Sequence, residues 1–168
     1  MKNRIFLYSL IFIALYSVQY IFAPLTLNGV GPEYILCGVV SISMFERQKF
    51  GAIYGLVFGL LSDFSSGGLF GINALIYMIL GYTVGYLVSY LLSVNVFTCF
   101  LMSTVTLIVR DFITVVLTDF VHDGNIGQAL LKVCLPKLIL TMPLTVLTYF
   151  VFKLIGTNRK WRSYSEEY

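Results

Sequence analysis

The feature that most constrains this chain is a series of apolar runs, several of them long enough to cross a lipid bilayer. A membrane span needs about 20 apolar residues at 1.5 Å per residue, and the runs 5–23, 72–92, 96–117 and 129–155 meet that length. Only 11% of the 168 residues are charged, against about 25% in an ordinary soluble domain. A water-soluble fold would expose large apolar patches, which mark membrane or partner contacts. The chain is therefore predicted to be an integral membrane protein.

Charge and motif content exclude several other classes. The net charge of +3 is far from the dense basic stripe that nucleic-acid binding needs. The chain has no GxSxG, HExxH, P-loop or dinucleotide motif, so no enzymatic activity and no cofactor are expected. The cysteines Cys37, Cys99 and Cys134 lie in apolar runs without zinc-ligand spacing. His122 stands between Asp119 and Asp123, and we expect these loop residues to be solvated, with no metal site.

Two further apolar runs, 33–45 and 50–61, are shorter than a full span. They are interpreted either as two short or tilted spans or as a re-entrant hairpin. A hairpin would place Arg47 and Lys49 at membrane depth, which is costly. We therefore predict an all-α bundle of six transmembrane helices over residues 1–157, with short second and third helices.

In this six-span arrangement, the basic residues cluster at the helix ends on one side of the membrane. The loops predicted to be outside hold Glu33, Asp63, Asp119 and Asp123 and no lysine or arginine. The inner ends hold Lys2, Arg4, Arg47, Lys49, Lys153, Arg159, Lys160 and Arg162. By the positive-inside rule, both termini are expected in the cytoplasm. Residues 158–168, with Trp161 among basic residues, are predicted to be a cytoplasmic tail at the anionic inner surface.

Glycines recur every four residues in two of the runs. Gly51, Gly55 and Gly59 lie on one face of the third predicted helix, and Gly81 and Gly85 repeat the spacing in the fourth. Small residues on one face allow another helix to approach closely within lipid. These faces are predicted to pack against helices of the chain itself or to bind a partner helix.

The third helix leads into an unusual motif. The segment Gly59-Leu60-Leu61-Ser62-Asp63 precedes a glycine-rich loop that ends at Gly71, and Ile72 opens the next span. This pattern resembles the MreD family of bacterial rod shape-determining membrane proteins, in which a glycine-rich helix leads to GL(L)xD, a glycine loop and LGxxAL. The matching residues are Gly55, Gly59, Leu60, Leu61, Asp63, Gly67, Leu69, Gly71, Ala74 and Leu75.

The resemblance implies a non-enzymatic scaffold of the cell-elongation complex in the bacterial cytoplasmic membrane, needed for rod shape. The implied partners are MreC, cytoplasmic MreB filaments, and RodA with its class B penicillin-binding transpeptidase, with no small-molecule substrate. The alternative is the substrate-binding subunit of an energy-coupling-factor vitamin transporter, which has a similar size and six helices. Such subunits usually carry an Ala-xxx-Ala pattern in the first helix, whereas Ala14 is followed four residues later by Val18.

Charged residues also lie well inside the predicted spans. Arg110 is roughly 12 Å from the outer end of its span at 1.5 Å per residue, beside Asp111, and Lys137 lies in the last span. A charge at that depth costs several kcal/mol unless it is paired or hydrated. We predict a buried cluster in the outer half that pairs Asp63 with Arg110 and Asp111 with Lys137. Its role is interpreted as an ion-pair clamp or as a surface for a partner or ligand.

Overall fold

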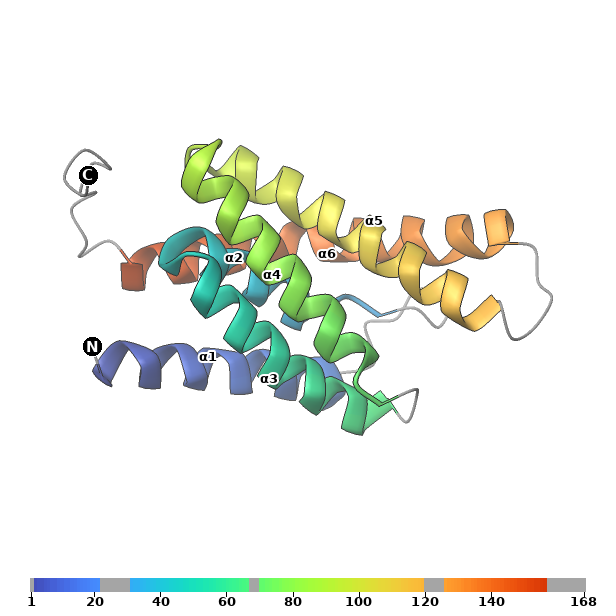
Figure 1. Ribbon diagram of the computed structural model, residues 1–168, viewed down its shortest axis with the longest axis horizontal. Helices are drawn as coiled ribbons and strands as arrows, with labels where there is room; N and C mark the ends of the chain where they lie inside the picture. The colour runs from blue at the N-terminus through green and yellow to red at the C-terminus, as the bar shows by residue number, and fades with distance from the viewer. Residues whose placement is uncertain (1, 22–30, 67–69, 120–125, 157–168) are drawn as a thin grey trace.

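The computed structural model describes residues 2–21, 31–66, 70–119 and 126–156. In these segments the chain is helical, as predicted, and forms six helices; α1 and α6 lie along the long axis of the molecule, and α3 and α4 cross it obliquely (Figure 1). Their bounds are α1 Lys2–Ile21, α2 Tyr34–Glu46, α3 Gln48–Ser66, α4 Ile72–Tyr90, α5 Val96–Asp119 and α6 Ile126–Gly156.

Among the described residues, three stretches are long and apolar enough to cross a membrane, namely Ile72–Tyr90, Val96–Leu117 and Cys134–Ile155. The apolar part of α1, Ile5–Tyr20, is shorter. Helix α2 has 13 residues, which is about 20 Å at 1.5 Å per residue against a hydrocarbon core of about 30 Å.

The prediction of a short third helix is wrong. Helix α3 has 19 residues and continues to Ser66, past the polar pair at which the predicted span ended. The polar side chains are satisfied where they lie: the Tyr20 hydroxyl of α1 lies 2.7 Å from Ser62 Oγ, and Asp63 accepts hydrogen bonds from the start of α4. Because these groups have partners, the polar pair does not end the helix.

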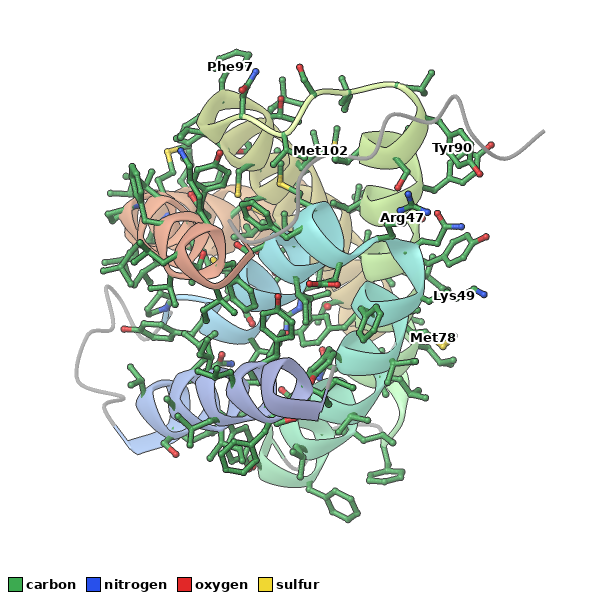
Figure 2. All side chains as sticks on the ribbon, turned by 90° about the vertical axis from the view of Figure 1, so that its left-hand side faces the viewer. Arg47, Lys49, Met78, Tyr90, Phe97 and Met102 are labelled. Atoms are coloured by element: carbon green, nitrogen blue, oxygen red, sulfur yellow. The ribbon has the colours of Figure 1, made fainter. Side chains whose placement is uncertain are left out.

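Helix α2 is the central helix of the bundle. It contacts each of the other five helices, and every residue from Tyr34 to Met44 is buried. In the view along the bundle (Figure 2), the other helices form a ring around α2. A helix that is apolar on all sides is expected to be enclosed in this way, and its enclosure explains why it is shorter than a lipid-facing span.

Aromatic side chains hold α1 against the bundle. The Phe12 ring lies 4.9 Å from the Tyr54 ring and 4.8 Å from the Phe58 ring, both on α3. The Tyr8 ring stacks 5.6 Å from Phe152 of α6. Offset-stacked and edge-to-face aromatic pairs at such distances add to the packing of the helices that carry them.

Candidate functional site

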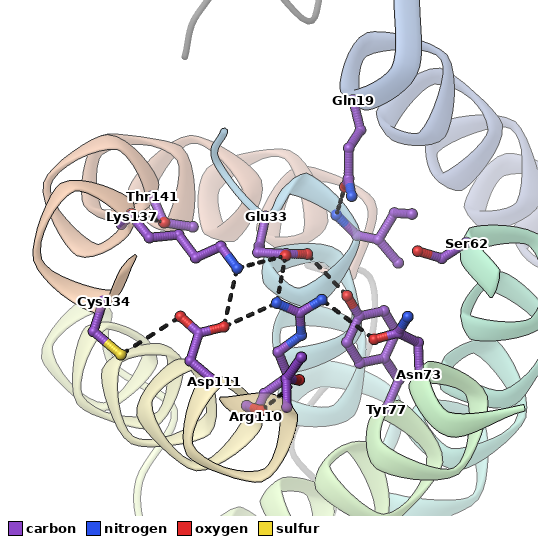
Figure 3. Close-up of polar contacts among 12 residues, drawn as sticks. Gln19, Glu33, Ser62, Asn73, Tyr77, Arg110, Asp111, Cys134, Lys137 and Thr141 are labelled. Carbon is purple, nitrogen blue, oxygen red and sulfur yellow. Dashed lines mark hydrogen bonds and ion pairs between the residues drawn. The ribbon is translucent and has the colours of Figure 1, made fainter. Parts of the chain in front are cut away.

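Four charged side chains meet inside the bundle (Figure 3), and we call them the ion cluster: Glu33, Arg110, Asp111 and Lys137. Arg110 Nη1 lies 2.9 Å from Glu33 Oε1 and 2.8 Å from Asp111 Oδ1. Lys137 Nζ lies 3.0 Å from Glu33 Oε1 and 2.9 Å from Asp111 Oδ1. Each carboxylate therefore contacts both cations, and the formal charges of the ion cluster sum to zero.

Neutral groups of α4 also bind the ion cluster. The Tyr77 hydroxyl donates to Glu33 Oε2 at 2.8 Å, and Arg110 Nη2 donates to Asn73 Oδ1 at 3.2 Å. Arg110 Nε is buried without a hydrogen-bond partner among the described residues. The guanidinium is thus held at its two terminal nitrogens, between the start of α2 and the start of α4.

Glu33 takes the place in the cluster that was predicted for Asp63. The residue directly precedes α2, and it is buried because α2 begins inside the bundle. The backbone N–H of Ile35 donates to Gln19 Oε1 of α1 at 3.1 Å, which satisfies one of the free donors at the start of α2. The sequence carried one signal for this position: an acid directly before an apolar run, in a chain whose predicted spans contain the cations Arg110 and Lys137.

The predicted direct pair between Asp63 and Arg110 is wrong. Asp63 Oδ2 accepts from the backbone N–H of Gly71 at 3.0 Å and of Ala74 at 3.1 Å. Oδ1 accepts from the backbone N–H of Asn73 at 3.2 Å and from its side-chain amide at 2.8 Å. A carboxylate is stabilised there by the free N–H groups and positive dipole end of α4. The connection from Asp63 to Arg110 runs through Asn73.

These contacts join all six helices into one polar network. Asp63 of α3 binds the start of α4, which binds Arg110 of α5. The ion cluster then connects α5 with α6 and with the start of α2, and Gln19 adds α1. Lys137 and Asp111 lie 2.9 Å apart in this network, in the combination that was predicted from the sequence.

The glycine face of α3 packs directly on the backbone of α4. A Cβ atom added at Gly55 would lie 2.4 Å from the backbone oxygen of Tyr77, and one at Gly59 would lie 2.5 Å from Ala74 Cα. Such distances are too short for any side chain, so the two backbones can approach only because glycine has no Cβ.

The glycines of α4 extend this contact between α3 and α4 toward the start of α3 and the end of α4. A Cβ atom at Gly81 would lie 2.5 Å from the backbone oxygen of Gly51, and one at Gly85 would lie 2.5 Å from Gln48 Cα. The structure thus places both glycine faces against each other inside the chain. Gly71 has a different role, because its φ of 94° favours glycine at the turn into α4.

A small cavity lies between α2, α5 and α6. Its lining includes the hydroxyl-bearing residues Ser103, Thr141 and Thr145 together with Cys37. Ser103 Oγ is buried and has no hydrogen-bond partner among the described residues. The predicted loop residues around His122, the side chain of Asp119 and the tail 158–168 lie outside the part of the chain that the structure describes.

Replacing Asp63 by alanine is expected to lower the free energy of unfolding by about 2 kcal/mol, because the start of α4 loses a charged cap. Thermal unfolding of the purified protein in detergent, followed by circular dichroism, measures this loss. The matched control is Thr83→Ala, since Thr83 is an exposed residue whose hydroxyl bonds within α4. Equal melting temperatures for the two variants would contradict the capping role.

The fold and the polar network define a helical membrane protein whose helices are joined by internal ion pairs. The family model described as rod shape-determining protein MreD matches residues 2–157, nearly the whole chain. The chain belongs to the MreD family, a family of membrane proteins in rod-shape determination, and the resemblance carried by the glycine motif is confirmed. Neither the curated proteins nor the solved structures contain a match to the chain.

Proposed function

We propose that this chain is a non-enzymatic membrane scaffold of the bacterial cell-elongation complex, needed for rod shape. The observation that carries the proposal is the family match over residues 2–157. The polar network supports it, because its charged groups are turned toward one another in the interior. A scaffold has to present constant surfaces to its partners, and a network that joins all six helices holds those surfaces in one arrangement.

We further propose that all six helices form one transmembrane bundle in the cytoplasmic membrane, with both termini in the cytoplasm. The exposed cations Arg47, Lys49 and Lys153 lie at the end of the bundle where α1 begins and α6 ends. The ion cluster lies toward the opposite end, where α2 and α4 begin. Among the side chains that the structure describes, the exposed cations gather at this end, as is typical of the cytoplasmic side.

The proposed partners are MreC, MreB filaments, and RodA with its class B penicillin-binding transpeptidase. The outward surfaces of α4 and α5 are apolar, with exposed residues such as Leu75, Ile79, Leu101 and Val105. In a membrane these surfaces meet either lipid or the spanning helices of other proteins. No observation on the described residues favours the alternative role as a vitamin-binding subunit.

Depletion of the protein in its native rod-shaped host is expected to give rounded cells, and expression of the wild-type gene is expected to restore rods. Cell width and length measured by microscopy test this, and copurification with MreC from solubilised membranes tests the scaffold role. The control is expression of an unrelated membrane protein at the same level. Unchanged cell shape after complete depletion would contradict the proposed function.

A further inference from the structure

Tyr82 lies near the middle of α4 with its side chain on the outside of the bundle. Helix α4, Ile72–Tyr90, is long and apolar enough to cross a membrane. Tyr82 stands ten residues from its start and eight from its end, about 15 and 12 Å at 1.5 Å per residue. Tyr82 is 48% exposed. With α4 across a hydrocarbon core of about 30 Å, this residue is far from both headgroup layers.

The hydroxyl of Tyr82 has no hydrogen-bond partner in the part of the chain that the structure describes. Side chains of a helix lean toward its N-terminus, so the ring of Tyr82 leans away from the nearer end of α4. The neighbouring Thr83 donates its hydroxyl to the backbone oxygen of Ile79 at 2.7 Å, whereas the rigid ring of a tyrosine holds its hydroxyl away from its own backbone. A hydroxyl without a partner is costly in hydrocarbon. This one therefore points to a partner outside the chain.

The outward position of Tyr82 sets it apart from Tyr77 on the same helix. Tyr77 is buried, and its hydroxyl donates to Glu33 Oε2 at 2.8 Å. Figure 2 shows α4 along one edge of the molecule, where Met78 and Tyr90 project outward. The interior of the bundle thus satisfies the hydroxyl of Tyr77, and the surface leaves that of Tyr82 to another molecule.

The outward face of α4 is suited to packing against another helix. Leu75, Ile79, Tyr82 and Tyr86 are exposed, and we call these four residues the α4 seam. Their steps of four, three and four residues follow the spacing at which two helices pack in a left-handed pair. The other side of α4 lies against the glycine face of α3. Residues 72–90 contain no charged side chain.

A second copy of this chain supplies the missing partner at the right depth. In a twofold pair whose axis runs along the bilayer normal, each residue of the seam lies level with the same residue of the other copy. A tyrosine hydroxyl is both a donor and an acceptor, so two Tyr82 hydroxyls satisfy each other. Because the seam carries no charge, a symmetric contact brings no like charges together.

We propose that the α4 seam is the contact between two copies of this chain in the membrane, with the two Tyr82 hydroxyls hydrogen-bonded to each other at its centre. Leu75 and Ile79 pack on one side of this hydrogen bond, and Tyr86 packs on the other. The contact does not depend on the proposed scaffold role. It leaves the outward face of α5 to other proteins or to lipid.

Single-molecule photobleaching of the labelled protein in phosphatidylglycerol vesicles, at a series of protein-to-lipid ratios, tests this contact. The wild type is expected to form dimers as the protein density rises. Tyr82→Phe removes the hydroxyl alone and should weaken dimerisation about threefold to tenfold, the range for one hydrogen bond between helices in a membrane. This variant should melt at the wild-type temperature in detergent, because the hydroxyl has no partner among the described residues.

The matched control is Tyr16→Phe, which removes a tyrosine hydroxyl from α1, where it bonds to Ser65 Oγ. This variant should dimerise as the wild type does. A wild-type protein that stays monomeric at every density would overturn the proposal. A Tyr82→Phe variant that dimerises as strongly as the wild type would overturn it as well.

Disulfide cross-linking in vesicles locates the contact. Ile79→Cys is expected to give a covalent dimer on oxidation, because the two copies of this position meet across the seam. Leu101→Cys, at an exposed position of α5, should stay monomeric, and the wild type with its native cysteines is the blank. Cross-linking of Leu101→Cys in place of Ile79→Cys would contradict the proposal. A protein that is monomeric in vesicles, and whose Tyr82→Phe variant fails to restore rod shape, would mean that a different protein binds the seam, which also overturns the second copy as its partner.

Discussion

Arg110→Leu is expected to lower the free energy of unfolding by about 3–5 kcal/mol, which is the loss typical of breaking a buried ion pair by removing one partner. The two carboxylates of the ion cluster would then share Lys137 as the remaining cation of the cluster. One negative charge would remain uncompensated in the interior, at a site where the Arg110 side chain is 12% exposed. The measurement is the unfolding midpoint in detergent, with helix content followed by circular dichroism.

A second variant distinguishes loss of charge balance from loss of packing. Glu33→Gln combined with Arg110→Leu leaves one acid and one base, Asp111 and Lys137, which lie 2.9 Å apart. The double variant should therefore be more stable than Arg110→Leu alone, because residues of one network are not additive. Lys49→Gln, which removes an exposed cation, should change stability by less than about 0.5 kcal/mol. A double variant less stable than Arg110→Leu alone would contradict the charge-balance explanation.

The second large effect is expected at the contact between α3 and α4. Gly55→Leu adds a Cβ atom that would lie only 2.4 Å from the backbone oxygen of Tyr77. Backbone cannot shift as a flexible side chain does, and the two helices have to separate. We expect the free energy of unfolding to fall by at least about 3 kcal/mol, at or above the upper range for overpacking.

The same separation should disturb the ion cluster. Tyr77 also donates to Glu33, so a displaced α4 removes one partner of that carboxylate. The measurements are the yield of folded protein and its unfolding midpoint, together with restoration of rod shape in depleted cells. Thr83→Leu adds similar bulk at an exposed position of α4 and should leave all three measurements unchanged. Wild-type stability for Gly55→Leu would show that the helices do not pack this closely.

The ion cluster accounts for why charged residues are tolerated at this depth. Four charges that cancel and share their partners avoid the cost of an isolated ion in lipid. Replacing a whole buried ion network by apolar residues is often neutral for stability. We therefore expect the ion cluster to contribute specificity more than stability. It sets the rotation and depth at which α2, α4, α5 and α6 meet, and a scaffold depends on that arrangement.

The hydropathy of the sequence by itself determined that the chain is helical and belongs to a membrane. Within lipid the backbone has to satisfy its own hydrogen bonds, so long apolar runs form helices whatever surrounds them. The glycine spacing likewise indicated two faces of close approach, and the motif around Asp63 indicated the family. These properties are local, since each depends on residues near one another in the chain.

Only the tertiary structure decided which groups meet. Ser62 and Asp63 look like the end of a helix until Tyr20 and the start of α4 satisfy them. Glu33 looks like a loop residue until α2 is seen to begin inside the bundle, level with Arg110. Pairing depends on the depth and rotation of each helix, and these are set by packing among all six helices. Spacing along one chain therefore cannot determine it.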